Sequence, residues 1–251
     1  MHLDVVTIFP ELFTPFRTTG VLGKAVERGL IEIGVHDLRA WAENRWGQVD
    51  DEPYGGGAGM VLQAPPVLRA VRSLAAGPTD PSHLILLTPS GEPFNQALAE
   101  ELAALRRVIV LCGRYEGFDE RIIDILRPRE ISLGDFILGG GEVAAMAVIE
   151  AVVRLVPGVV GDPASVVDDS FSHGLLDHPC YTRPPVVEGH PVPEVLRSGN
   201  HEAVRRWRLE RAVAATLSRR PDLVSDHWDG YPDEVRELIA RIRQASSDGE
   251  P

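Results

Sequence analysis

The fold is decided by the stretch 108-VIVLCGRYEGFDERIIDILRPREISLGDFILGGGE-142. It contains two short, mostly apolar runs, Val108–Cys112 and Glu130–Leu133, which are separated by a segment with helical spacing, Glu120–Leu126. A glycine-rich loop follows each run. Apolar strands that alternate with short amphipathic helices are typical of a parallel sheet covered on both faces. The stretch therefore predicts an α/β fold.

The same alternation extends toward the N-terminus. Further strands are expected at residues 3–9, 30–38 and 84–88, and further helices at 22–28, 66–75 and 95–105. Residues 142–156 are apolar on nearly every side, which predicts a buried helix. We predict one α/β domain over residues 1–160.

The pattern changes after this helix. Residues 157–194 are rich in proline and glycine and lack apolar periodicity, so we predict an interdomain linker over 161–192. Helical spacing returns at 194–197, 200–219 and 233–244, with Asn200 as an N-cap and Pro221 as a stop signal. These features predict a small all-α domain over 193–251, with a frayed tail from residue 245.

Composition places the chain among ordinary globular proteins. Its 251 residues are 44% hydrophobic and 25% charged, which excludes disordered and fibrous classes. Cys112 and Cys180 lie far apart and no secretion signal precedes them, so we expect reduced thiols in a cytoplasmic protein. The apolar runs are shorter than the ~18 residues that a membrane span needs, and no membrane contact is predicted.

The charge is unevenly distributed. The formal net charge of −12 argues against a nucleic-acid partner when the whole chain is considered. Residues 197–220, however, hold seven arginines against two glutamates. A solvated helix face and a phosphate-binding surface both remain open for this run.

Four glycine-rich loops predict a small-molecule site. Three of them directly follow a predicted strand, where ligands of open α/β sheets bind and where glycine allows close approach of the backbone. A tight turn without a ligand is the alternative for any one loop alone. The four loops are 55-GGGAGM-60, 88-TPSGEP-93, 113-GRYEGFD-119 and 134-GDFILGGGE-142.

Common nucleotide, hydrolase and metal motifs are absent. The only lysine is Lys24, so no P-loop G-x-x-x-x-G-K-[ST] exists, and no G-x-G-x-x-G follows the first strand. The sequence also lacks G-x-S-x-G and H-E-x-x-H. His173 and His178 have no neighbouring soft ligands, so no metal site is predicted.

Six strings in one order resemble the bacterial tRNA (guanine-N1)-methyltransferases (TrmD family), which modify the guanosine 3′ of the anticodon, at tRNA position 37. The resemblance runs from the first strand to about Asp222. The strings are 50-DDEPYGGGAGM-60, 112-CGRYEGFDER-121, 132-SLGDFILGGGE-142, 169-DSF-171, 181-YTRPP-185 and 198-SGNHEAVRRWRLE-210.

The resemblance implies a SPOUT fold with a deep trefoil knot, an exception to the rule against threaded chains. It also implies a homodimer with the active site between subunits, and S-adenosylmethionine as methyl donor. The residues that it assigns to the donor site are Leu87, Thr88, Pro89, Gly113, Tyr115, Glu116, Leu133, Gly134, Asp135, Phe136, Ile137, Leu138, Gly140 and Gly141.

The resemblance further assigns Asp169 as the base for guanine N1 and Arg154 as the cation beside O6. From the residues alone, a cap or turn residue is the favoured interpretation of Asp169, and a helix-end arginine that reaches solvent is the favoured interpretation of Arg154. The C-terminal domain would bind the anticodon branch of tRNA. The residues implied in tRNA binding are Gly59, Arg183, Asn200, Arg205 and Arg208.

Two positions depart from the family pattern. Ala58 stands where a proline is usual, and Asp168 places a second carboxylate beside Asp169. A non-catalytic RNA-binding α/β protein and a knotted methyltransferase acting on another RNA nucleoside remain alternatives. The presence of Asp169, Arg154 and Glu116 favours the guanine-specific enzyme.

Overall fold

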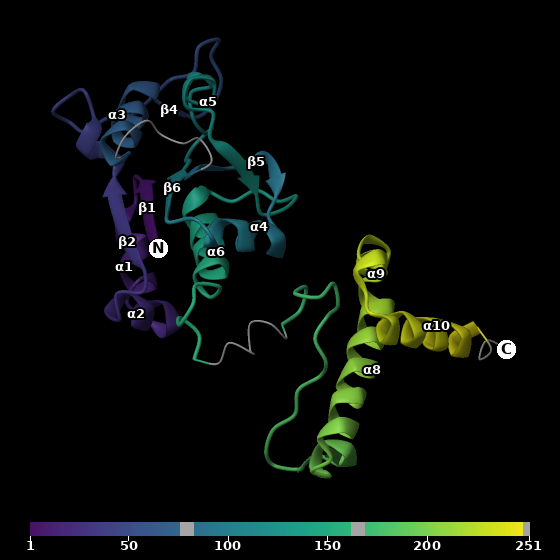
Figure 1. Ribbon diagram of the computed structural model, residues 1–251. Coiled ribbons are helices and arrows are strands. Elements are labelled where there is room, and N and C mark those ends of the chain that lie inside the picture. The colour runs from purple at the N-terminus through teal and green to yellow at the C-terminus, as the bar shows by residue number, and fades with distance from the viewer. Residues whose placement is uncertain (76–82, 162–168, 248–251) are drawn as a thin grey trace. The chain divides into compact units, whose positions relative to one another are not determined.

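The computed structural model describes residues 1–75, 83–161 and 169–247 (Figure 1). The chain divides into two compact units, Met1–Pro163 and Ala164–Pro251. Asp168 and the last four residues of the expected tail lie outside the described residues.

A five-stranded sheet forms the centre of the first unit. The strands follow the order β2-β1-β6-β5-β7, and every strand is parallel to its neighbours, as the sequence predicts. Because β6, β5 and β7 are adjacent and point the same way, their carboxyl ends meet at one edge of the sheet. The strands are β1 (His2–Thr7), β2 (Glu32–Asp37), β5 (Leu84–Pro93), β6 (Arg107–Cys112) and β7 (Arg129–Ser132).

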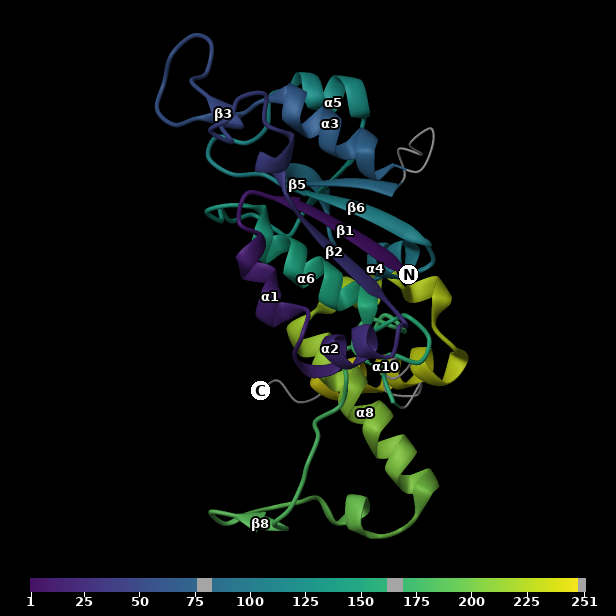
Figure 2. The ribbon, with the colours of Figure 1, turned by 90° about the vertical axis from the view of Figure 1, so that its left-hand side faces the viewer.

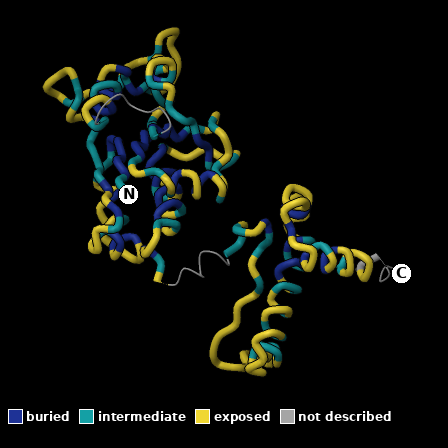
Figure 3. Tube along the Cα trace, viewed as in Figure 1, coloured by how far each residue is buried: buried dark blue, intermediate teal, exposed yellow. Residues whose placement is uncertain are grey.

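Helices cover both faces of this sheet (Figure 2). Successive side chains of β1 enter opposite cores: Leu3 and Val5 pack into one, and Val6 packs into the other. Figure 3 draws the buried residues in dark blue, and those of the first unit gather in its interior. One face carries α1 (Phe13–Phe16), α2 (Gly20–Glu27), α4 (Gln96–Ala103) and α6 (Gly141–Val153), and the other carries η2 (Leu38–Trp41), α3 (Ala64–Leu74) and α5 (Arg121–Leu126).

The helix predictions hold for this unit. Helix α6 is buried along most of its length, which explains its lack of a polar face. Asn95 caps α4, because its Oδ1 accepts a hydrogen bond from Leu98 N at 2.9 Å. The trefoil knot stays a prediction.

Short elements in the first unit were not expected. Turn η1 (Pro10–Leu12) follows β1, and strands β3 (Asp50–Asp51) and β4 (Val61–Leu62) pair antiparallel at the base of the 52–60 loop. Residues 88–93, expected as a loop, are the second half of β5. The strand continues because it pairs with β7 again after a register shift between Leu87 and Glu92.

The second unit has a small helical core. Its elements are η4 (Glu194–Arg197), α8 (His201–Arg219), α9 (Pro221–Asp226), η5 (Trp228–Gly230) and α10 (Asp233–Ser247), which confirm the expected helices. Asn200 caps α8, as predicted, with its Oδ1 accepting from Ala203 N at 3.1 Å. Pro221 does not only end a helix: it begins α9, because proline suits the first turn of a helix.

The predicted linker is partly structured. Strands β8 (Val186–Val187) and β9 (His190–Pro191) form a short hairpin. Residues 174–176 are fastened to the helices of the second unit, because Tyr231 Oη donates to Gly174 O at 2.6 Å and Leu176 N donates to Thr216 Oγ1 at 2.9 Å. Tyr231 and Thr216 are buried, so this attachment belongs to the core.

Candidate functional site

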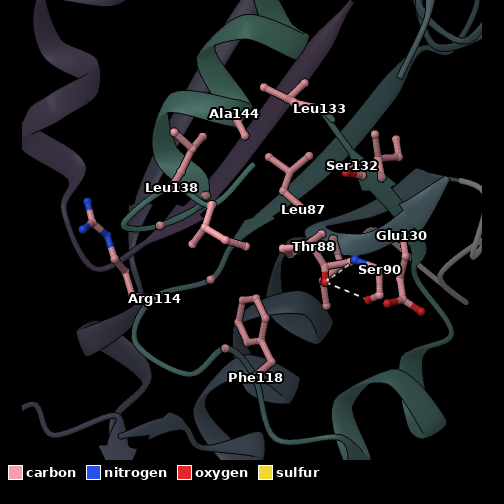
Figure 4. A pocket seen from close by; sticks show the side chains of 18 of the residues that line it. Leu87, Thr88, Ser90, Arg114, Phe118, Glu130, Ser132, Leu133, Leu138 and Ala144 are labelled. Atoms are coloured by element: carbon pink, nitrogen blue, oxygen red, sulfur yellow. Dashed lines mark hydrogen bonds between the residues drawn. The ribbon is translucent and has the colours of Figure 1, made fainter. Parts of the chain in front are cut away.

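A cavity of about 400 Å³ opens at the carboxyl ends of β5, β6 and β7. Figure 4 shows that Leu87, Leu133, Leu138 and Ala144 gather on one side of it. The other side is polar: Thr88 Oγ1 and Ser90 Oγ are hydrogen-bonded at 2.9 Å. The cavity therefore offers an apolar wall and a polar wall to one ligand.

Nearly all of the residues predicted to bind the donor line this cavity. The exception is Asp135, which is exposed. The backbone turns tightly there, with Phe136 N donating to Gly134 O at 2.9 Å, and this turn leaves Asp135 outside the lining. The residues that do line it are Leu87, Thr88, Pro89, Gly113, Tyr115, Glu116, Leu133, Gly134, Phe136, Ile137, Leu138, Gly140 and Gly141.

Backbone hydrogen bonds hold the loops around the cavity together. Gly141 N donates to Gly113 O at 2.8 Å, which joins the start of α6 to the end of β6. Glu116 N donates to Met60 O at 3.0 Å, which joins the loop after β6 to the 55–60 loop. These hydrogen bonds fix the three loops relative to one another.

Three glycines in these loops are explained by close packing. A Cβ at Gly140 would collide with the Arg114 side chain and lie 2.7 Å from Glu142 Oε2. One at Gly141 would lie 2.9 Å from Cys112 Cα. Gly59, with φ of +88°, lies against the Glu116 carboxylate, with which a side chain would collide. Glycine at these positions allows the loops to pack closely, and it also allows a ligand to approach the backbone.

Tyr115 adopts a backbone conformation that is unusual for its type. Its φ is +60°, in the left-handed region, and its side chain is 52% exposed at the cavity. Non-glycine residues held in this conformation concentrate at functional sites. Tyr115 is therefore positioned by its loop and not by burial.

The ionisable lining is predominantly acidic. Glu116, Glu120 and Glu130 line the cavity, and Arg114 is the basic residue among the described lining. Arg114 Nε donates to Glu142 Oε2 at 2.8 Å, so its charge is already balanced by a carboxylate. None of the three glutamates forms an ion pair with another described residue. Such carboxylates favour a positively charged ligand over a phosphate.

Cys112 lies at the end of β6 but does not supply a nucleophile. Burial raises the pKa of its thiol well above the usual range, and the charge of Glu142 raises it further. A thiol that remains protonated is a poor nucleophile. Neither Cys112 nor Cys180 is in a disulfide.

The two predicted catalytic residues do not line the cavity. Arg154 is the exposed C-cap of α6, whereas Gly141 at the first turn of this helix lines the cavity. A rise of ~1.5 Å per residue separates the two by roughly 20 Å along the helix axis. Asp169 belongs to the second unit, in a turn where Ser172 N donates to Asp169 O at 3.3 Å.

The arginines of α8 differ in their partners. Arg205 contacts two carboxylates, Glu202 at 2.9 Å and Glu234 of α10 at 3.0 Å. Arg208 is exposed and has no ion-pair partner within the described part of the chain. The Arg208 guanidinium is therefore available to a phosphate, whereas the Arg205 guanidinium is already paired with one carboxylate of α8 and one of α10.

The remaining residues predicted to bind tRNA are distributed over both units. Gly59 lies in the first unit, and the exposed Arg183 and the N-cap Asn200 lie in the second. The second unit also holds an aromatic pair: the Tyr181 and Trp207 ring centroids are 6.2 Å apart, and Arg211 Cζ lies 5.9 Å from the Trp207 ring. Exposed cations beside aromatic rings are the elements of an RNA-binding surface.

Sequence reasoning missed several lining residues. Arg114, Phe118, Ser90 and Glu130 contribute side chains to the cavity but were not predicted. Arg114 and Phe118 stand inside a quoted motif, so their position between two predicted residues was the available signal. For Ser90 and Glu130 the signal was weaker, because the pairing of β5 with β7 brings them to the cavity.

Comparisons with known proteins agree with this geometry. No helix of the described residues combines the length and apolar character needed to cross a bilayer. The sequence pattern of the family described as tRNA (Guanine-1)-methyltransferase TrmD matches residues 1–226.

Similar proteins named tRNA (guanine-N(1)-)-methyltransferase occur in several bacteria. That of Rhodopirellula baltica is 52% identical over 241 residues, 95% of this chain and 100% of the relative. That of Synechococcus sp. (strain JA-3-3Ab) is 54% identical over 251 residues, covering 100% and 98%. That of Deinococcus radiodurans is 55% identical over 224 residues, covering 89% and 80%. With matches of this extent, the chain belongs to the tRNA (guanine-1)-methyltransferase TrmD family.

Proposed function

We propose that the protein transfers a methyl group from S-adenosylmethionine to N1 of the guanosine at position 37 of tRNA. The observation that carries the proposal is the cavity at the ends of β5, β6 and β7, with its apolar wall and its three uncompensated carboxylates. Family membership supports methylation of guanine N1 in tRNA. The donor and the position in tRNA are inferred from the residues present.

The lining fits S-adenosylmethionine. When bound, this molecule supplies an electrophilic methyl group on a sulfonium whose departure leaves a neutral thioether. Leu87, Leu138 and Ala144 provide an apolar surface for an adenine ring. Glu116 and Glu130 provide negative charge for the sulfonium and ammonium groups. The backbone of the lining loops after β6 and β7 offers donors and acceptors for the adenine edge.

Removal of the N1 proton is the difficult part of the reaction. Guanine N1 carries a proton at neutral pH, so that proton leaves as the bond to the methyl carbon forms. We assign the acceptor to the Asp169 carboxylate, and the Arg154 guanidinium to the negative charge that develops on O6. The balance is one N1–H and one sulfur–methyl bond broken, and one N1–methyl and one carboxyl O–H bond formed.

A second copy of the chain is needed to complete this site. Arg154 lies at the end of α6 opposite the cavity, so the two parts do not meet within one first unit. Apolar side chains are exposed near the cavity: Ile137 is 81% and Val143 is 59% exposed. A homodimer that covers these side chains and brings Arg154 and Asp169 of one copy to the cavity of the other accounts for both observations.

The second unit is proposed to bind the anticodon branch. Arg208 and Arg211 are exposed on α8, and the Trp207 ring, which contacts Arg211, lies at a tilt to the Tyr181 ring with 6.2 Å between the centroids. Local positive charge on a chain of net charge −12 suits a polyanion that is bound at one surface only.

Two tRNA transcripts test the function. They differ only in carrying guanosine or adenosine at position 37, and each is incubated with methyl-labelled S-adenosylmethionine. We expect label in the guanosine transcript alone. Transfer to both transcripts would contradict the assigned position, and transfer to neither would contradict the assigned activity.

Mixing two inactive variants tests the shared site. Glu116→Ala impairs the cavity and Asp169→Ala removes the base, so each homodimer is expected to be impaired. A heterodimer of the two contains one intact site if the copies share it, and we expect activity to return. A verified heterodimer without activity would assign each site to a single chain.

A further inference from the structure

A buried carboxylate outside the cavity connects the loops that surround it. Glu142 is the second residue of α6 and is 0% exposed. Its Oε1 accepts from Thr7 Oγ1 at 2.8 Å, and its Oε2 accepts from Arg114 Nε at 2.8 Å. Glu142 does not line the cavity, and the methyl-transfer chemistry has no use for it.

Arg114 extends this connection to the loop before α6. Its Nη1 donates to Gly139 O at 2.9 Å, and its Cζ lies 4.6 Å from the centroid of the Phe9 ring. The guanidinium points away from the other labelled side chains of the cavity (Figure 4). Arg114 therefore lines the cavity, while its guanidinium is turned away from the other labelled lining residues and binds the Gly139 carbonyl.

The four groups join three segments that are distant in sequence. Thr7 ends β1, Arg114 follows β6, and Gly139 and Glu142 flank the start of α6. Gly140 lies against the Arg114 side chain, with which a side chain at position 140 would collide. The Glu142–Arg114 ion pair therefore requires a glycine at this position.

Loop contacts continue the connection to the opposite side of the cavity. Arg114 O accepts from Gly117 N at 3.0 Å, and Glu116 N donates to Met60 O at 3.0 Å. Displacement of Arg114 would therefore move the loop that carries Tyr115 and Glu116.

We propose that Glu142 is a positioning residue for methyl-donor binding, acting through the Glu142–Arg114 ion pair that fixes the loops on both sides of the cavity. The proposal rests on the proposed function in that the ligand of the cavity is S-adenosylmethionine. A planar guanidinium can satisfy Glu142 and Gly139 together, whereas a lysine ammonium at the same place cannot reproduce that geometry.

A matched control exists on β1, away from the end of this strand at Thr7. Asp4 of β1 is 1% exposed and is bound by Arg107, whose Nη2 lies 2.7 Å from Asp4 Oδ2. It does not contribute to the cavity lining. Asp4→Asn and Glu142→Gln thus each neutralise a buried carboxylate that pairs with arginine, and only the second lies next to the cavity loops.

The experiment measures S-adenosylmethionine affinity by titration calorimetry and thermal unfolding of the full chain for wild type, Glu142→Gln and Asp4→Asn. For Glu142→Gln we expect a dissociation constant ~10–100-fold higher, the loss typical of a charge-assisted hydrogen bond. Asp4→Asn is expected to lower the unfolding temperature with a dissociation constant within about twofold of wild type.

Arg114→Lys carries the test alone if Glu142→Gln fails to fold, and the double variant Arg114→Lys/Glu142→Gln is added where both single variants fold. We expect Arg114→Lys to weaken donor binding about as much, and the double variant to lose little more than either single one, because the residues act as a pair. Additive losses, or donor affinity within about twofold of wild type in the folded variants, would overturn the proposal. Failure of the wild type to bind S-adenosylmethionine would instead overturn the proposed function.

Discussion

The cavity loops of the first unit and the α8 surface of the second unit are organised in opposite ways. Around the cavity, backbone hydrogen bonds, closely packed glycines and the buried Glu142 fix the shape. On α8, arginines stand exposed and their ion pairs face solvent. We infer that the cavity recognises its ligand by a fixed shape that includes a few carboxylates, and that α8 is suited to a partner recognised by charge at an open surface.

The largest expected effect concerns Asp169, the base in the proposed mechanism. Asp169→Asn keeps the shape of the side chain but cannot accept a proton. Turnover should fall by ~10²–10⁴-fold, while S-adenosylmethionine affinity stays unchanged. Single-turnover methylation at saturating tRNA measures it. Near-normal turnover would reject Asp169 as the base, and Asp168 would be substituted next.

A pair of adjacent glycines tests whether shape governs the cavity. A Cβ at Gly140 collides with Arg114, whereas one at Gly139 lies 3.6 Å from Arg114 Nη1, an ordinary contact. Gly140→Ala should weaken S-adenosylmethionine binding by roughly 10-fold or more, because the ion pair must open. Gly139→Ala should leave it near the wild-type value. Equal affinities in calorimetry would show that the packing does not control the cavity.

A pair of arginines tests whether charge governs α8. Arg208→Ala should weaken tRNA binding several-fold and lower the slope of log affinity against log salt by about 0.7–0.9. Arg205→Ala should change that slope little, because Glu202 and Glu234 already neutralise Arg205. Filter binding over a series of salt concentrations measures both. A larger loss for Arg205→Ala would reverse the assignment.

The smallest functional effect is expected at Asp4. Burial opposes its ionisation, but hydrogen bonds from His36, Arg107 and His2 outweigh burial and lower its pKa. Because the folded pKa lies below the unfolded value of about 3.9, Asp4 stabilises the protein above that pH, and this contribution is lost as the pH falls further. Asp4→Asn should therefore flatten the acid limb of stability in urea unfolding between about pH 5 and pH 3, with methylation unchanged at neutral pH. An unchanged acid limb would contradict this role.

The sequence predicted what local pattern and strand order determine. The five parallel strands, the caps Asn95 and Asn200, and the loops around the cavity follow from apolar runs, capping residues and glycines. Pairing between distant segments was not predictable. The register shift that extends β5 and the attachment of Leu176 to Thr216 depend on tertiary contacts that no local pattern encodes.

The same difference between local patterns and contacts of distant segments applies to the site. Glu142 and Arg114 stand 28 residues apart, and only the fold makes them a pair. The resemblance to the family assigns Arg154 to the reaction, and the structure places Arg154 at the end of α6 opposite the cavity. In the proposed site, which two copies of the chain form together, the sequence does not show how far apart Arg154 and the cavity lie within one copy.

The most direct test of the contrast between cavity and α8 is the salt dependence of both affinities in the wild-type protein. Dissociation constants for S-adenosylmethionine and for tRNA are measured from about 50 to about 300 mM salt. We predict that tRNA affinity falls steeply, with each phosphate contact adding about 0.7–0.9 to the log–log slope, and that donor affinity changes little. Similar slopes for the two ligands would contradict the account, because one kind of interaction would then govern both surfaces.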